Sequence, residues 1–164
     1  MTQEDKALLL KDLCARIPYE VVGKCEIDAS YDTSFDTLLQ IHEFDAVVYG
    51  IKEDLLLVTP LIEYEDEQNF AEEEVADGVD ILDFTPYLLP MSSMTDKDLV
   101  EFLQIKGMNL NSDELKTFRR EPITIVSTLP SYSRHIDWLN AHHFDYRGLI
   151  EKGLAIDATG LNIY

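Results

Sequence analysis

The sequence predicts an α+β protein with an N-terminal helix, a small curved antiparallel sheet or open barrel, and a C-terminal helical part with one short strand. Three observations support this prediction. Apolar residues recur at helical spacing in residues 1–18, β-branched and polar residues mix in residues 19–91, and helical spacing returns in residues 92–164. The 164 residues suit a single domain spanning 1–164, because domains of this size are common.

The first segment predicts a helix from about Thr2 to Arg16. Thr2 suits the N-cap position, and Asp5, three residues later, completes a pattern like a capping box. Pro18 ends the helix, because proline lacks the amide hydrogen and its ring blocks the preceding turn. One face carries the apolar residues that we expect to be buried, Leu9, Leu13 and Ile17.

The middle segment predicts antiparallel strands joined by short turns. We expect strands over four ranges, 19–27, 37–49, 55–64 and 81–89. In the second of these, the candidate inward side chains are Leu39, Ile41, Val47 and Tyr49. Residues 65–80 are expected to form an acidic loop, because only Phe70 and Val75 offer apolar anchors there.

The last segment predicts helices with recognisable start and stop signals. Thr95 caps the first helix, Asp98 follows three residues later, and Gly107 ends the helix. Ser112 begins a second helix that ends near Arg120. The remaining expected elements are a strand over 122–129, a helix over 134–143 capped by Ser133, and a short helix bracketed by Gly148 and Gly153.

The charge of the chain is strongly negative and unevenly distributed. The formal net charge is −19 at pH 7, from 13 basic and 32 acidic residues. Residues 53–96 contain 13 of the acidic residues and neither Lys nor Arg. A surface of this kind repels phosphate groups, so the sequence disfavours direct binding to nucleic acid.

The sequence also bears on where the protein resides. No apolar run approaches the roughly 18 residues that a membrane helix needs, so we expect no membrane span. The chain starts with acidic rather than basic residues, unlike a secretory signal. Cys14 and Cys25 form no CxxC pair, and we expect two buried, reduced thiols. Together these features predict a cytoplasmic protein.

The acidic middle segment has three interpretations. The simplest is a solvated loop that aids solubility. The second is a divalent cation site, since Glu63 and its neighbours offer oxygen ligands, although the spacing of a calcium-binding loop is absent. The third is a surface that binds a basic protein partner and competes with nucleic acid for it. The candidate interaction residues are Glu65, Asp66, Glu67, Glu72, Glu73 and Glu74.

Three histidines lie near one another in the C-terminal part, His135, His142 and His143. One interpretation is a metal-dependent hydrolase that uses them with nearby carboxylates. On a helix, however, His135 would lie two turns, about 10 Å, from the other two. The alternative is that they pack against aromatic rings or meet water. The chain has no nucleophile elbow, phosphate loop or dinucleotide fingerprint, so we predict no catalytic residue and no cofactor.

Aromatic residues crowd the same segment, where Trp138, Phe144 and Tyr146 follow one another closely. Dense aromatics are typical of a core, but they are also enriched, with arginine, at protein interfaces. Arg147, next to Tyr146 and Asp145, suits either a buried ion pair or an interface anchor. The candidate interaction residues in this segment are Trp138, His142, His143, Tyr146 and Arg147.

Three stretches of the sequence carry a resemblance, LLLKDLCAR at Leu8–Arg16, PYLLPMSSMT at Pro86–Thr95 and DWLNAHHFDYRGLIEKGLA at Asp137–Ala155. The chain resembles, in these stretches, a large family of uncharacterised proteins from gut anaerobic bacteria and their phages. No activity accompanies the resemblance, so it transfers no catalytic residue. It implies a phage or mobile-element context and favours partner binding.

The sequence therefore predicts a non-enzymatic protein-interaction module of phage or mobile-element origin, with an acidic surface against a basic protein partner. A metal-dependent hydrolase is the first alternative, and a structural or assembly component is the second. No feature of the sequence predicts the oligomeric state or the identity of the partner.

Overall fold

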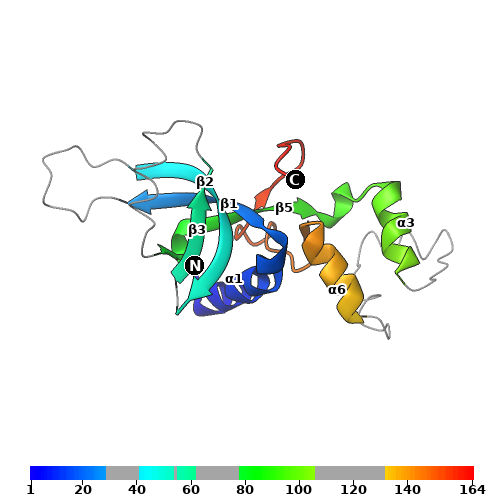
Figure 1. Ribbon diagram of the computed structural model, residues 1–164, viewed down its shortest axis with the longest axis horizontal. Helices are drawn as coiled ribbons and strands as arrows, with labels where there is room; N and C mark the ends of the chain where they lie inside the picture. The colour runs from blue at the N-terminus through cyan, green and yellow to red at the C-terminus, as the bar shows by residue number, and fades with distance from the viewer. Residues whose placement is uncertain (29–40, 54, 62–77, 106–131) are drawn as a thin grey trace, which may run out of the picture. The chain divides into compact units, whose positions relative to one another are not determined.

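A computed structural model describes residues 1–28, 41–53, 55–61, 78–105 and 132–164 (Figure 1). The chain divides into two compact units, an N-terminal unit of Met1–Tyr87 and a C-terminal unit of Leu88–Tyr164. An N-terminal helix, an open mixed sheet and later helices confirm the predicted α+β class. The single domain expected from the length stays a prediction. Among the described residues, no helix is long and apolar enough to cross a membrane.

The N-terminal unit begins with helix α1 (Gln3–Arg16), which starts at the predicted capping box. The Thr2 hydroxyl accepts a hydrogen bond from the Asp5 amide at 3.1 Å, and the Asp5 carboxylate accepts one from the Thr2 amide at 3.0 Å. These bonds satisfy amide groups that a helix start leaves without intrahelical partners. Pro18 lies in the 3-10 turn η1 (Ile17–Tyr19), so the α-helix ends where predicted.

The buried face of α1 combines leucines with two charged residues. It consists of Leu9, Asp12, Leu13 and Arg16, each with 0% exposure. Arg16 Nε lies 2.7 Å from Asp12 Oδ2, and Arg16 Nη2 donates to Asp12 Oδ1 at 3.3 Å. A carboxylate and a guanidinium are therefore held together, one helical turn apart, inside the protein. Ile17, expected on this face, is half-buried because the chain has left the α-helix there.

Five strands of the N-terminal part pair antiparallel in the order β4–β3–β2–β1–β5 (Figure 1). Their bounds are β1 (Val21–Asp28), β2 (Ile41–Lys52), β3 (Leu55–Pro60), β4 (Val79–Asp80) and β5 (Phe84–Pro90). The 3-10 turn η3 (Ile81–Asp83) joins β4 to β5, and it contacts both α1 and β1. The predicted antiparallel strands are thus present, although the expected portions over 37–40 and 62–64 lie outside the described residues. The acidic loop expected over 65–80 also lies outside them up to residue 77, and its last two residues form β4 instead of a loop.

The inward side chains of β2 differ from the expected set. Ala46 and Val48 are buried, whereas Val47 is half-buried and Tyr49 is 60% exposed. The prediction was therefore wrong for Val47 and Tyr49. Alternate residues of a strand point to opposite faces, so a phase error of one residue exchanges the two faces. The other two predicted positions, Leu39 and the side chain of Ile41, fall outside the described residues.

The two cysteines lie in different surroundings. Cys25, on β1, is buried as expected, but Cys14 is exposed because it lies off the buried face of α1. Burial raises the pKa of the Cys25 thiol to about 12, and the nearby charges of Asp45 and Asp83 add to the effect. Burial also raises the pKa of Tyr87 to about 12, with a further contribution from the hydrogen bond that its hydroxyl donates to Asp45 at 2.8 Å.

These two raised pKa values predict a loss of stability in alkali. In the unfolded chain the groups ionise near 9.0 and 10.0, whereas in the folded chain they stay neutral. The stabilisation is therefore complete below pH 9 and falls as the pH rises towards 12. Between pH 8 and 10.5, wild type should lose about 2–3 kcal/mol more than a Cys25→Ala/Tyr87→Phe variant, measured by urea unfolding. Equal losses in both proteins would refute this assignment.

The C-terminal unit contains two described helices, α3 (Asp96–Gln104) and α6 (Tyr132–Ala141). Thr95 caps α3 as predicted, and the Thr95 amide donates to Asp98 Oδ2 at 2.8 Å. The end of β5 pairs in parallel with β6 (Phe144–Asp145), and β7 (Ile156–Asp157) also pairs with β5. A parallel pair needs a long crossover connection, which the chain between β5 and β6 supplies, so the sheet is mixed rather than purely antiparallel.

Two local predictions in this unit were wrong. Helix α6 begins at Tyr132, so Ser133 lies inside its first turn rather than at the N-cap, and the helix ends before His143. Gly148 and Gly153 bracket hydrogen-bonded turns instead of a helix. The buried Asp145 carboxylate explains these turns, since its two oxygens accept the amides of Leu149 and Ile150 at 2.9 and 2.8 Å. The expected Gly107 cap, the helix over 112–120 and the strand over 122–129 lie outside the described residues.

Candidate functional site

Trp138 joins several aromatic rings in the C-terminal unit. Its ring lies 3.8 Å from that of His142 in a stacked arrangement and 5.8 Å from that of Phe144, also stacked. Phe102 of α3 meets Trp138 edge-on at 5.4 Å. Leu139 and Met94 belong to the same buried cluster. Trp138 itself is half-buried, so it packs at the edge of the core and stays partly accessible to solvent.

His142 follows the last residue of α6, and its ring is held through Nδ1. Nδ1 lies 2.9 Å from the carbonyl oxygen of Trp138, and a carbonyl can only accept, so Nδ1 carries the proton. Nε2 faces Glu101 of α3 at 3.9 Å. The side chain is 38% exposed. His142 is therefore a ring fixed in place with one edge towards a carboxylate.

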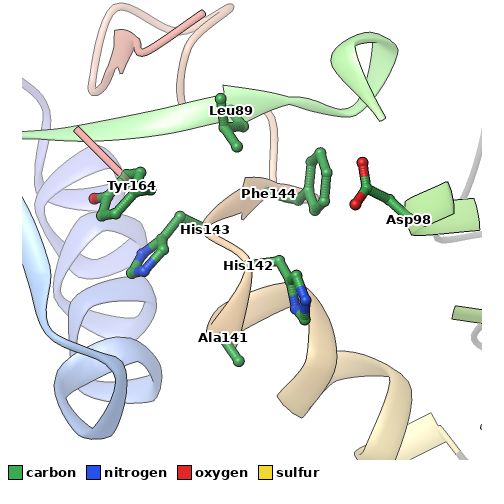
Figure 2. A pocket seen from close by; sticks show the side chains of 7 residues that line it. All are labelled: Leu89, Asp98, Ala141, His142, His143, Phe144 and Tyr164. Carbon is green, nitrogen blue, oxygen red and sulfur yellow. The ribbon is translucent and has the colours of Figure 1, made fainter. Parts of the chain in front are cut away.

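His143 adopts a left-handed backbone conformation, with a φ of 55°. Its amide donates to the Asn140 carbonyl at 3.1 Å, which closes the end of α6. The reversal of the chain sends the side chains of His142 and His143 to different sides, as Figure 2 shows. The buried His143 ring stacks on the Tyr164 ring at 3.6 Å with an interplanar angle of 5°.

A pocket lies at this end of α6, entirely within the C-terminal unit, with a volume of about 430 Å³ (Figure 2). Its walls are aromatic and aliphatic except for one carboxylate. The lining residues are Leu89, Asp98, Ala141, His142, His143, Phe144 and Tyr164. Pockets that bind small groups typically have volumes of roughly 300–1,000 Å³ and few polar groups. This pocket is therefore the candidate binding site of the unit.

The structure separates the residues predicted to interact in this segment. His142 and His143 line the pocket. Trp138 does not line it but stacks on the His142 ring. Tyr146 is buried in the core cluster, and the Arg147 guanidinium lies 4.8 Å from the centre of its ring. Arg147 Nη2 also donates to the Tyr146 hydroxyl at 2.8 Å. Tyr146 and Arg147 therefore stabilise each other beside the pocket rather than lining it.

The histidines do not converge on one point. His135 is buried with its ring 4.7 Å from that of Phe102, edge-on, away from the pocket lining. Within the described ranges, no group of three or more His, Cys, Asp or Glu side chains is placed to hold a metal ion. The hydrolase interpretation stays a prediction.

The predicted acidic interaction residues lie outside the described residues, namely Glu65, Asp66, Glu67, Glu72, Glu73 and Glu74. On the strands of the N-terminal unit, the exposed carboxylates of Glu26 (β1) and Glu43 (β2) lie opposite each other. Like charges in such a position are unfavourable. Lys24 reaches both carboxylates, and the hydrogen bond with Glu43 raises the pKa of Lys24.

Sequence reasoning missed most of the pocket. Leu89, Asp98, Ala141 and Tyr164 come from separate parts of the chain, and Asp98 was assigned only a capping role. The adjacent pair His142 and His143, just after a helix, was the one local signal of the site. Compared with protein-family models, with curated proteins and with solved structures, the chain gives no match.

Proposed function

We propose that the chain is a non-enzymatic protein-interaction module whose acidic N-terminal unit binds a basic protein. The observation that supports this proposal is the division of charge between the units. Residues 1–87 contain 22 acidic and 5 basic residues, a net charge of −17, whereas residues 88–164 contain 10 and 8, a net charge of −2. An origin in a phage or another mobile element rests on the sequence resemblance alone.

Most of the few basic side chains of the N-terminal unit form ion pairs with acidic side chains of the same unit. Arg16 pairs with the buried Asp12, Lys24 with Glu43, and Lys6 with Asp80 at 3.9 Å. Three of the five basic residues therefore already have acidic partners in the same unit. The net charge of −17 generates a negative potential around this unit, which accelerates encounter with a positively charged partner and weakens as salt rises.

Capture from lysates of the source cells tests this proposal when it uses two charge-matched variants. Glu72→Gln/Glu73→Gln/Glu74→Gln removes three charges from the N-terminal unit. The control removes three from exposed positions of the C-terminal unit, with Asp96→Asn, Asp137→Asn and Glu151→Gln. The two variants have the same net charge, so a difference between them reports where the charge lies.

Wild type and the control variant should capture the same basic protein at low salt and release it at high salt. The N-terminal variant should capture at least about threefold less, because each lost surface contact weakens binding modestly. Equal capture by the two variants, or capture of no basic protein by wild type, would refute the proposal.

A further inference from the structure

The pocket of the C-terminal unit combines aromatic rings with one carboxylate, and it plays no part in the binding proposed for the N-terminal unit. Four of its lining residues carry rings, His142, His143, Phe144 and Tyr164, and two aliphatic side chains and one carboxylate complete the lining (Figure 2). Tyr164 is 46% exposed, so a ligand can reach its ring from solvent. Aromatic faces carry negative charge density and attract cations that lie over them.

Asp98 supplies the charge of the pocket and is fixed in position. Its Oδ2 accepts hydrogen bonds from the Thr95 amide at 2.8 Å and from the Thr95 hydroxyl at 2.6 Å. Both of these bonds go to Oδ2, and the second oxygen, Oδ1, is the one that we expect to face a ligand. In Figure 2 the carboxylate stands beside the Phe144 ring. A carboxylate held by a helix cap loses little freedom when it binds a donor.

The charges around the pocket favour a cation over an anion. Asp98 is negative, and the carboxylate of Glu101 lies next to His142 Nε2. An anionic ligand would meet both carboxylates, whereas a neutral apolar ligand would take water from Asp98 without replacing its hydrogen bonds. A cationic ligand with an apolar stem satisfies the rings and the carboxylate together.

We propose that this pocket binds the guanidinium group of an arginine side chain presented by a partner protein. A guanidinium is planar, so it stacks on ring faces, and its edge donates paired hydrogen bonds to a carboxylate. The ammonium of lysine is a more strongly hydrated point charge and gains less from stacking. The aliphatic stem of arginine would lie against Leu89 and Ala141. The proposal concerns a second site, separate from the acidic surface of the N-terminal unit.

The backbone strain at His143 agrees with a binding role. A side chain at a φ of 55° costs free energy that a glycine would avoid, and such positions cluster at binding sites. Here the strain orients His143 towards Tyr164, and this stack holds one wall of the pocket. The pocket is therefore largely formed before any ligand binds.

Nuclear magnetic resonance titration of the whole chain with Nα-acetyl-arginine amide tests the proposal directly. Trp138 is the single tryptophan of the chain, so its indole N–H gives one identifiable signal beside the pocket. This signal and the backbone amides of residues 141–144 should shift and saturate, with a dissociation constant on the order of 1 mM for so small a probe. The corresponding citrulline amide has the same shape without the charge and should bind at least about tenfold more weakly.

Two variants and a matched control localise the binding. Asp98→Asn keeps an oxygen that can accept the cap hydrogen bonds but loses the charge, and it should weaken binding roughly tenfold. Tyr164→Ala removes an exposed wall and should weaken it by a similar factor. Asp96→Asn makes the same chemical change in the same turn of α3, at an exposed position outside the pocket lining, and should leave binding within about twofold.

Several outcomes would overturn the proposal. These are the absence of saturable shifts, equal binding of the citrulline probe, binding of Nα-acetyl-lysine amide as tight as that of the arginine probe, or unchanged binding by Asp98→Asn. The N-terminal charge variant, Glu72→Gln/Glu73→Gln/Glu74→Gln, should bind the arginine probe like wild type. A failure of the acidic surface and a failure of this pocket are therefore distinguishable.

Discussion

Replacement of Asp12 by alanine should destabilise the folded protein by about 3–5 kcal/mol, because it removes a carboxylate that is paired with the buried charge of Arg16. Both side chains have 0% exposure, and two hydrogen bonds join them. In water the guanidinium would be fully hydrated, but in the interior the Asp12 carboxylate replaces much of that hydration. Removal of the carboxylate forces the chain to bury the charge at a cost or to open the end of α1.

Urea unfolding monitored by circular dichroism measures this loss. The double variant Asp12→Leu/Arg16→Met, which replaces both charges by apolar groups, should recover most of the stability, since a buried ion pair contributes little net free energy over well-packed apolar residues. Glu4→Ala, at an exposed position of the same helix, should change the free energy of unfolding by about 0.5 kcal/mol or less. A loss below 1 kcal/mol for Asp12→Ala would contradict the prediction.

Replacement of Gly23 by alanine should cost about 3 kcal/mol or more, because β5 passes too close to β1 for any side chain at that position. An added Cβ would overlap Phe84 Cζ and would lie 2.7 Å from the Thr85 carbonyl oxygen. Phe84 is buried at 1% exposure and has little room to move, and the carbonyl belongs to the backbone of β5. The strands would have to separate where Gly23 pairs with Pro86.

Gly50→Ala is the matched control, since Gly50 also lies in a strand of the same sheet. The nearest atom to its added Cβ is Leu57 Cδ1 at 3.2 Å, the end of a flexible side chain, so this variant should lose about 1 kcal/mol or less. Phe84→Leu in the Gly23→Ala background should restore part of the lost stability but not all of it, because the contact with Thr85 remains. Equal unfolding midpoints for the two glycine variants would show that the strands are not so closely packed.

The parts of the fold that the sequence predicts well are those with local causes. The two capping boxes, Thr2 with Asp5 and Thr95 with Asp98, require only residues three positions apart, and both are present. Pro18 ends α1 for an equally local reason. The buried ion pair was also within reach, because Asp12 and Arg16 continue the helical stripe of Leu9 and Leu13, but their charge suggested exposure.

The features that the sequence did not predict depend on distant partners. The inward face of β2 is fixed by its register with β1 and β3. The prediction placed this face one residue out of phase, so it chose Val47 where Val48 is buried. The pocket needs Asp98 from α3 and Tyr164 from the last residues to meet His142 and His143. The spacing of these residues along the chain does not indicate that they lie close together in the fold. The left-handed conformation of His143 was equally hidden, since glycine or asparagine usually marks it.

The path of strand β5 affects how this protein can change by recombination. Pro86 pairs with Gly23 in the N-terminal unit, and Leu89 pairs with Phe144 in the C-terminal unit, while the boundary falls between Tyr87 and Leu88. Domains that are exchanged between proteins usually meet at exposed linkers. Here the boundary lies inside a paired strand, so a recombination event at this boundary would have to join the first half of β5 from one gene to the second half from another. The two units should therefore be inherited together, and genes that encode one of them should also encode the other.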